Sequence, residues 1–179
     1  KPETLKVYNK NPPLITQSPD RRWLLVQRPE PSGGNITLDE FDTDDLTKAP
    51  RALVVPSDLL SSLANSVLQE VEWSTDNKHL LLRHTFSGGD EFVIFNRDIP
   101  AESININRVF NVSPTEVALR DKKIGELYIF LQKSGDLQIA TMADSRLTPL
   151  IKGVIAFKSS GPDLICYVTA QDAPAGQVV

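Results

Sequence analysis

The chain has 179 residues, enough for one domain with a sizeable core, and its 40% hydrophobic and 23% charged residues are ordinary for a globular protein. The net charge of -4 argues against a nucleic-acid-binding surface, which usually carries a basic stripe. No apolar stretch reaches the roughly 18 residues of a membrane-spanning helix, so no direct membrane insertion is expected. The chain begins at Lys1 and its one methionine is Met142, which favours a processed product or a fragment of a longer protein.

Short apolar runs, separated by clusters of Gly, Pro, Asp, Asn and Ser, follow one another along the chain. Their enrichment in Val, Ile, Leu and aromatic residues is typical of many short antiparallel strands. The expected strands lie at 13–16, 23–26, 36–38, 52–55, 79–82, 91–95, 108–110, 116–119, 127–130, 137–140, 154–157 and 164–168. One segment differs: in SDLLSSLANSVL (57–68), Ser57 can cap a helix and the leucines recur at helical spacing. The spacing predicts one short helix near 57–67.

A nine-residue phrase occurs twice, as SPDRRWLLV at 18–26 and STDNKHLLL at 74–82. Asp20, Asp76 and Asp121 hold the same place in three successive units, between a first strand and a strongly apolar second strand. A short Asp side chain can accept backbone N–H bonds two residues on and so hold a tight turn. We therefore interpret the three carboxylates as structural turn residues.

Glycine pairs mark a second kind of turn. Gly33-Gly34 and Gly88-Gly89 each precede a third strand, and are expected to supply the positive φ angles that hairpin turns need. A fourth strand is expected at 52–55, 105–112 and 147–151. The chain is thus predicted to be a single repeat domain over 1–179, with units at about 12–56, 68–113, 114–152 and an incomplete 153–179.

These units resemble the four-stranded blades of TolB-type, WD-repeat-like bacterial β-propellers. The resemblance is carried by QSPDRRWLLV (17–26) and EWSTDNKHLLL (72–82); VALRDKKIGELYIF (117–130) keeps the Asp without the Ser and Pro, and IAFKSSGPDLICYV (155–168) keeps only the outline. The run KHLLLRH with EFVIFNRDIP is also similar to propellers that follow PEGA modules in bacterial surface proteins. The resemblance implies an all-β, propeller-like fold of about three to four four-stranded antiparallel blades.

The number of units leaves the closure of the ring open. Closed propellers have about 4–8 blades, whereas this sequence holds three units and the start of a fourth. The chain could be a partial propeller continued by further blades, an arc closed by a second copy in a homodimer, or a small four-unit ring.

The two tryptophans, the cysteine and the two histidines are candidate site residues. Trp23 and Trp73 are expected to be core anchors, with ligand stacking as the alternative, and Cys166, in an apolar run, to be buried. His79 and His84 lie five apart on one expected strand, on opposite faces, so they cannot share a metal ion. No catalytic or cofactor-binding residue and no cofactor is predicted.

The acidic stretch DEFDTDD (39–45) is the one candidate metal loop. Asp39, Asp42, Asp44 and Asp45 could offer oxygen ligands to calcium, although a solvated loop is the preferred interpretation because the glycine and distal glutamate of an EF-hand are missing. A sugar-active enzyme would need paired carboxylates, for which Asp98, Glu102 and Asp144 are available.

These observations favour a non-catalytic binding or scaffold module of the bacterial envelope or cell surface, extracytoplasmic, with a protein partner rather than a nucleic acid. Its recognition loops are expected at 28–35, 39–50 and 96–105, since function tends to reside on loops held by a rigid frame. The alternative is an accessory propeller domain, gating or substrate-binding, of a hydrolase whose catalytic part lies outside this chain. A G-x-S-x-G nucleophile elbow does not occur in the sequence.

Overall fold

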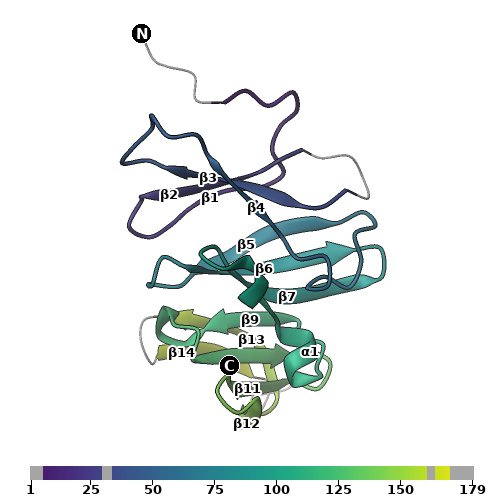
Figure 1. Ribbon diagram of the computed structural model, residues 1–179. Helices are drawn as coiled ribbons and strands as arrows, with labels where there is room; N and C mark the ends of the chain where they lie inside the picture. Colours follow the sequence, from purple (N-terminus) through teal and green to yellow (C-terminus); the bar gives the residue numbers. More distant parts are fainter. Residues whose placement is uncertain (1–5, 30–33, 161–163, 170–179) are drawn as a thin grey trace. The chain divides into compact units, whose positions relative to one another are not determined.

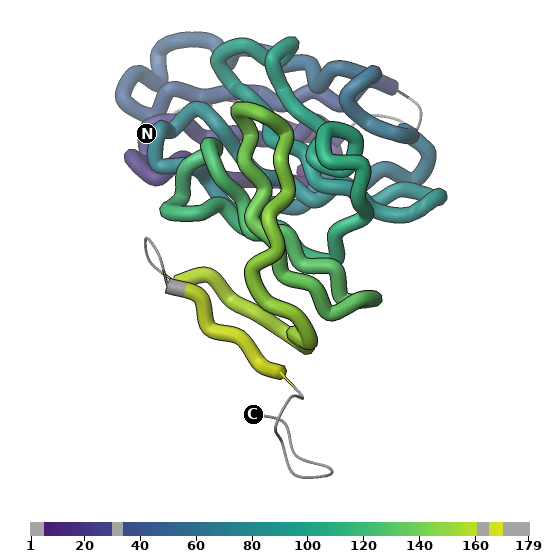
Figure 2. The backbone as a smooth tube through the Cα atoms, turned by 90° about the horizontal axis from the view of Figure 1, so that it is seen from below, coloured from purple at the N-terminus to yellow at the C-terminus, as the bar shows by residue number. Residues whose placement is uncertain are grey.

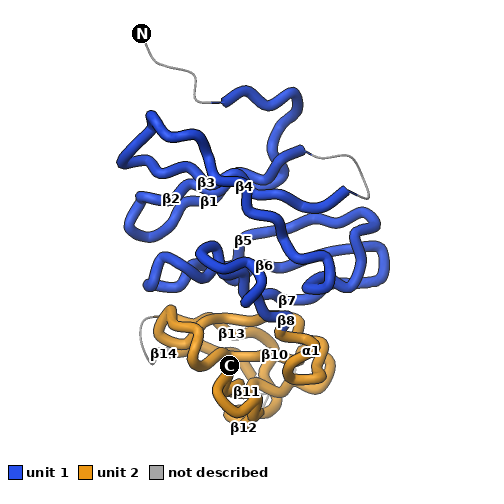
Figure 3. The backbone as a smooth tube through the Cα atoms, in the orientation of Figure 1, with its two compact units in different colours: residues 1–105 blue, residues 106–179 orange. Residues whose placement is uncertain are grey.

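The computed structural model describes residues 6–29, 34–160 and 164–169 (Figure 1). The chain divides into two compact units, residues 1–105 and 106–179 (Figure 3), and each is described by itself. Within the described ranges, no helix combines the length and the apolar character that a membrane crossing requires.

Short β-strands make up most of the regular structure. In unit 1 they are β1 (Ile15–Gln17), β2 (Trp23–Gln27), β3 (Thr37–Asp42), β4 (Arg51–Val54), β5 (Val67–Trp73), β6 (His79–Phe86), β7 (Gly89–Asn96) and β8 (Ile104–Asn105). In unit 2 they are β9 (Glu116–Leu119), β10 (Glu126–Leu131), β11 (Asp136–Thr141), β12 (Arg146–Ile151), β13 (Val154–Ser160) and β14 (Leu164–Thr169). The helical segments are short: α1 (Ile106–Phe110) and the 3-10 turns η1 (Pro100–Glu102) and η2 (Arg120–Lys122).

The strands form small antiparallel sheets in which chain neighbours are sheet neighbours. Strands β1–β4, β5–β8 and β9–β12 each make a four-stranded sheet, and β13 pairs with β14. Four-stranded antiparallel sheets repeated along a chain are the form of propeller blades. The predicted all-β, blade-like fold class is confirmed. The predicted single domain and its unit boundaries stay predictions.

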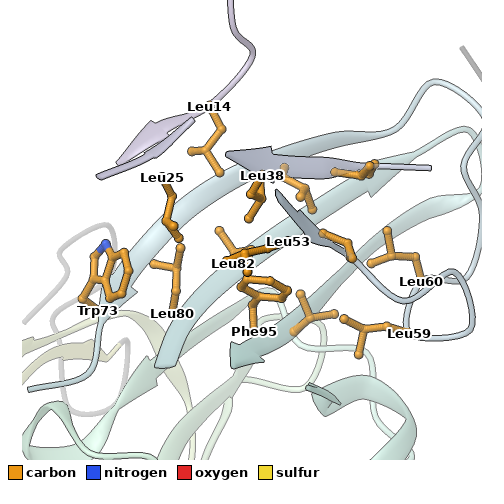
Figure 4. Packing of buried hydrophobic residues seen from close by; sticks show 14 residues of the cluster. Leu14, Leu25, Leu38, Leu53, Leu59, Leu60, Trp73, Leu80, Leu82 and Phe95 are labelled. Atoms are coloured by element: carbon orange, nitrogen blue, oxygen red, sulfur yellow. The ribbon is translucent and has the colours of Figure 1, made fainter. Parts of the chain in front are cut away.

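The core of unit 1 lies between its two sheets (Figure 4). Leu25 and Leu38 project from the first sheet, and Leu80, Leu82 and Phe95 from the second. Alternate residues of one strand point to the same face of a sheet, so β6 offers Leu80 and Leu82 to this core together. The burial of this shared face holds the two sheets of unit 1 against each other.

Unit 2 has a smaller core between its four-stranded sheet and the β13–β14 hairpin (yellow in Figure 2). Tyr128, Phe130 and Leu137 are buried there, and the ring of Phe157 meets those of Tyr128 and Phe130 edge-on at centroid distances of 6.4 and 5.8 Å. Edge-to-face aromatic pairs add to the burial of apolar area. The hairpin is therefore fastened to the sheet through Val154, Phe157 and Ile165.

The helix predicted near 57–67 does not form; the segment between β4 and β5 is a series of turns. Leu59 and Leu60 enter the core of unit 1 from this loop. The backbone N–H of Ser61 donates to Oε1 of Glu91 at 2.7 Å, and Asn65 has a left-handed φ of 53°. Tertiary bonds and burial have replaced the helix that the leucine spacing favoured.

Two further expectations on local structure are wrong. The strand predicted at 105–112 consists of the short β8 followed by α1, because Ile106 and Phe110, four residues apart, bury the same face of a helix. Cys166 is exposed, since the described residues of β14 from 165 to 169 are half-buried or exposed.

Candidate functional site

A cavity of about 410 Å³ lies at the end of unit 1 where β2 begins and β3 ends. We call it the arginine cavity. It is lined by Arg22, Trp23, Glu40, Asp42, Lys48, Ala49, Arg51, Arg97 and Asp98. Its residues come from both sheets of unit 1, so only the folded unit assembles it.

The turn before β2 positions Arg22 and Trp23 at the mouth of the cavity. The Ser18 hydroxyl accepts the Trp23 backbone N–H at 3.0 Å and donates to Oδ1 of Asp20 at 2.5 Å. The same Asp20 oxygen accepts the Arg22 backbone N–H at 3.0 Å, and Arg21 adopts a φ of 64°. A Ser–Asp turn of this kind fixes the direction in which the next two side chains leave the strand.

Glu40 holds two arginines of the cavity in place. Its Oε1 accepts from Nε of Arg51 at 3.0 Å and its Oε2 from Nη1 of Arg97 at 2.9 Å. Arg97 also donates to the backbone oxygen of Asn77 at 2.6 Å and pairs with Asp98 at 3.1 Å. Because the Glu40 side chain is nearly inaccessible to solvent, both guanidinium groups are fixed before any ligand arrives.

Arg22, which also lines the cavity, is held by Asp42. Its Nε and Nη2 donate to the two oxygens of Asp42 at 3.1 and 2.9 Å. The hydrogen bond from Arg22 holds the pKa of Asp42 below its usual value, so the carboxylate stays ionised at neutral pH. The guanidinium carbons of Arg97 and Arg22 lie 4.1 and 4.7 Å from the ring centroid of Trp23, which makes cation–π contact with both.

The two tryptophans expected to be core anchors lie in different surroundings. Trp73 is buried in the core of unit 1, and its Nε1 donates to Oγ1 of Thr16 at 2.7 Å. Trp23 is half-buried, outside that core cluster and beside the cavity. The two arginines over its ring occupy the space that core side chains would fill.

The four carboxylates of the candidate metal loop do not converge. Asp39 is buried and bonds to Lys6, to Nη2 of Arg28 at 2.8 Å and to Tyr8 at 2.8 Å. Asp42 faces Arg22; Asp44 is exposed and Asp45 pairs with Lys48 at 3.0 Å. Among the described residues, no cluster of three or more His, Cys, Asp and Glu side chains is placed to hold a metal ion.

The turn residues differ more than the repeat suggested. Asp76 accepts the backbone N–H groups of Lys78 and His79 at 2.8 and 3.0 Å, and its Oδ2 lies 2.6 Å from Nδ1 of His79. Asp121 instead adopts a φ of 53° itself, and Nζ of Lys123 donates to its carboxylate at 2.5 Å.

The glycine pairs also differ from the expectation. Gly89 has a φ of 144°, but Gly88 is not in the positive-φ region; a Cβ there would lie 2.9 Å from the Phe86 ring. Gly34 is exposed at the start of the segment leading into β3. Gly33 lies outside the described residues. Of the described pair Gly88-Gly89, Gly89 has the expected positive φ and Gly88 does not.

The three carboxylates considered for sugar chemistry have different surroundings. Asp98 lines the cavity, Glu102 in η1 accepts from Nδ2 of Asn96 at 3.4 Å, and Asp144 in unit 2 pairs with Arg146 at 3.1 Å. Of the predicted recognition loops, 39–50 and 96–105 contribute to the cavity. Part of 28–35 lies outside the described residues.

Arg51 and Arg97 were missed by sequence reasoning. Arg51 begins β4 and Arg97 directly follows β7, and a strand end is the commonest place for a solvated side chain. A signal existed in retrospect: Arg51 is opposite Glu40 in the β3–β4 register, a cross-strand pair of opposite charge. Arg97 comes to this pair from the other sheet, and no local sequence pattern predicts its contact with Glu40.

Comparisons with known proteins identify no family: no protein-family model and no curated protein matches the chain. The solved structures that resemble it include two that are each named "putative 6-phosphogluconolactonase". The one from Bacteroides uniformis ATCC 8492 is 12% identical over 86% of this chain, with a TM-score of 0.40. The one from Bacteroides fragilis NCTC 9343 is 13% identical over 86%, with a TM-score of 0.42. The chain spans 42% and 41% of their lengths, less than half of either.

These titles contradict the expected non-catalytic binding or scaffold module, and the accessory hydrolase domain kept as its alternative, because both name an enzyme. Neither expectation is retained. At this level of similarity the titles describe those proteins and establish no activity for this chain. The expectations of a protein partner and of a second copy stay predictions.

Proposed function

We propose that the arginine cavity binds a small hydroxylated molecule that carries an anionic group, such as a sugar acid or a sugar phosphate. The observation that carries this proposal is the convergence of Arg22, Arg51 and Arg97 on one cavity. A cavity of about 410 Å³ falls in the ordinary range of roughly 300–1,000 Å³ for small-molecule sites.

The exposed arginines of the cavity favour an anion. The lining holds four cationic side chains (three arginines and Lys48) and three carboxylates (Glu40, Asp42 and Asp98), and Lys48 also pairs with Asp45 outside the lining. The Arg22 and Arg51 side chains are 46% and 49% exposed, so an incoming oxyanion can reach them. An anionic group would bind to these exposed guanidinium groups beside the carboxylates that already hold them.

Free donors support the same conclusion. Arg22 and Arg51 both donate through Nε and Nη2, and Nη1 of each has no hydrogen-bond partner in the part of the chain that the structure describes. A guanidinium held on one edge presents its other N–H groups in a fixed direction, which suits phosphate or carboxylate oxygens. Asp98, 38% exposed, can accept hydrogen bonds from ligand hydroxyls.

The test is isothermal titration of the full chain with D-gluconate, glucose 6-phosphate, glucose and inorganic phosphate. We expect the two molecules that combine hydroxyls with an anionic group to bind at least tenfold more tightly than glucose or phosphate. The affinity should weaken as salt is added, because exposed charges are screened.

The matched variants are R51Q and R146Q, the second replacing an exposed arginine of unit 2. R51Q should lower the affinity at least tenfold, since a hydrogen bond to a charged group contributes about 1.5–3 kcal/mol, and R146Q should leave it unchanged. Equal binding by the wild type and R51Q, or no binding of any probe, would refute the proposal.

Three finer expectations stand beside this proposal. The TolB-type character of the blades is supported by the Ser18–Asp20 turn, whose bonds give the Ser-Pro-Asp phrase a physical role. The likeness to propellers that follow PEGA modules and the extracytoplasmic or cell-surface location rest on the sequence phrases alone.

A further inference from the structure

A second polar cluster lies at the other end of the β5–β8 sheet from the arginine cavity. Glu91, near the start of β7, is six residues from Arg97, just past its end. At 3.2–3.4 Å per residue this puts the two side chains about 20 Å apart along the strand. The cluster is therefore separate from the proposed ligand site.

Ser66, His84 and Glu91 form a chain of hydrogen bonds. Oγ of Ser66 lies 2.6 Å from Nε2 of His84, and Nδ1 of the same ring lies 2.9 Å from Oε1 of Glu91. An ionised carboxylate only accepts hydrogen bonds, so Nδ1 carries the proton. Nε2 of the neutral ring then accepts the hydroxyl proton of Ser66.

Glu91, the acid of this hydrogen-bonded series, is held in place by several donors. The backbone N–H and the hydroxyl of Ser61 donate to Glu91 at 2.7 and 2.5 Å, and Nδ2 of Asn105 donates at 2.8 Å. Burial alone would raise the pKa of Glu91, but the bonds from Ser61, Asn105 and His84 together hold it below its usual value. A buried, ionised Glu91 fixes the tautomer and orientation of His84.

The base is buried and the hydroxyl is nearer the surface. The His84 side chain is inaccessible to solvent, and its ring stacks on Phe86 at a centroid distance of 5.2 Å. Ser66 is half-buried between Asn65, which has a φ of 53°, and Val67, which is 43% exposed. Ser66 thus lies at the end of the loop between β4 and β5, more accessible to solvent than the base His84.

We propose that Ser66, His84 and Glu91 are a nucleophile–base–acid triad that hydrolyses small carboxylic esters. Such triads are recognised by geometry and by the role of each group rather than by a sequence motif, and they recur on unrelated folds. A nucleophile within hydrogen-bond reach of a base that a third group orients is the arrangement seen here.

The reaction proceeds in two balanced steps. Oγ of Ser66 bonds to the ester carbonyl carbon, its proton passes to Nε2 of His84, the ester C–O bond breaks and the leaving alcohol takes that proton. Water then attacks the acyl group on Ser66 and gives a proton to His84, which returns it to Oγ as the carboxylic acid leaves.

The first experiment treats the full chain with a fluorophosphonate, which bonds to an activated serine with loss of fluoride. Mass spectrometry of the digested protein should find the adduct on Ser66. Ser87 is the matched control, because it is exposed and its hydroxyl accepts from Asn65 next to the triad, yet no histidine activates it in the structure as described. S66A should abolish the labelling and S87A should not.

The second experiment measures hydrolysis of p-nitrophenyl acetate and p-nitrophenyl butyrate. S66A should lower the rate at least a hundredfold and S87A less than twofold, as expected when the nucleophile or a bystander is removed. E91Q keeps the shape of the acid but removes its charge, and we expect it to lower the rate of hydrolysis. If Glu91 had a purely structural role, a folded E91Q variant would hydrolyse the esters at the wild-type rate. The melting temperature of each variant checks that it is folded.

Two results would overturn the proposal: no adduct on Ser66 in the folded wild type, or hydrolysis that S66A leaves intact. The three side chains would then only fasten the loop between β4 and β5. Labelling is independent of the ligand proposal, because R51Q should react with the fluorophosphonate as the wild type does.

Discussion

The two compact units use similar strands but bury them differently. In unit 1 two four-stranded sheets share one apolar cluster of 14 buried residues. In unit 2 a four-stranded sheet meets a hairpin in a smaller cluster, and the hairpin exposes Ile155 and Tyr167 by 43% and 48%. A strand buries a face only where a second sheet covers it, so a hydrophobic strand is not by itself a buried one.

The largest test of this contrast is a pair of truncations. F95A removes a fully buried ring from the core of unit 1 and should lower the free energy of unfolding by about 3–5 kcal/mol, because a cavity is left behind. I155A, on the exposed hairpin of unit 2, should change it by less than about 0.5 kcal/mol. Urea unfolding followed by circular dichroism measures both. Equal losses would show that the hairpin is as well packed as the core of unit 1.

Acid sensitivity should follow the buried carboxylates of unit 1. Although burial raises their pKa values, hydrogen bonds hold those of Asp39 and Glu91 below the ordinary 3.8 and 4.5. Their folded pKa values are lowered, so their contribution to stability is complete above these ordinary values. It is lost progressively as the pH falls below about 4.5 toward the folded values.

Urea unfolding at pH 7, 5, 4 and 3 measures this dependence. E91Q should flatten the decline of the free energy of unfolding with falling pH, because one of the two groups no longer titrates. The control variant is D136N, which removes a carboxylate at a half-buried position of unit 2. A free energy of unfolding that rises between pH 5 and pH 3 would contradict the assignment.

A smaller test compares two glycines. G89A in unit 1 forces a side chain onto a φ of 144° and should cost about 1–3 kcal/mol, because that backbone region is essentially restricted to glycine. G125A in unit 2 has no heavy atom within 4 Å of the new Cβ and no positive φ, and should cost less than about 0.5 kcal/mol. Thermal unfolding separates the two. A G89A variant as stable as G125A would mean that the β6–β7 turn can relax.

Much of the fold could be predicted because the strands and turns depend on residues close together in the sequence. The alternation of apolar runs with turn residues located most strands, and the Ser-Pro-Asp phrase located the turn that aims Arg22 and Trp23. The short helix at 57–67 was a wrong prediction for a physical reason. The leucine spacing fits one face of a helix. Leu59 and Leu60 instead pack from a loop into a core that the sequence alone does not reveal.

The site was less predictable than the strands. Trp23, Asp42 and Asp98 were named as candidates, yet their roles depend on Arg51 and Arg97, which come from different sheets. A nucleophilic serine was sought in the sequence only as a G-x-S-x-G motif, whereas Ser66 meets His84 and Glu91 through the fold. Spacing along one strand had shown only that His79 and His84 cannot share a ligand.

The sequence by itself determined the all-β class, the blade-like repeat of strands and turns, and the tight turns at Asp20 and Asp76, because these depend on neighbours a few residues away. The tertiary structure decided which tryptophan is buried, whether the loop between β4 and β5 is helical, and which charged and polar side chains meet. Those outcomes depend on residues up to 57 positions apart, such as Ser61 with Glu91 and Glu40 with Arg97. The position of a partner across such a separation is set by the packing of the sheets, and no local pattern encodes it.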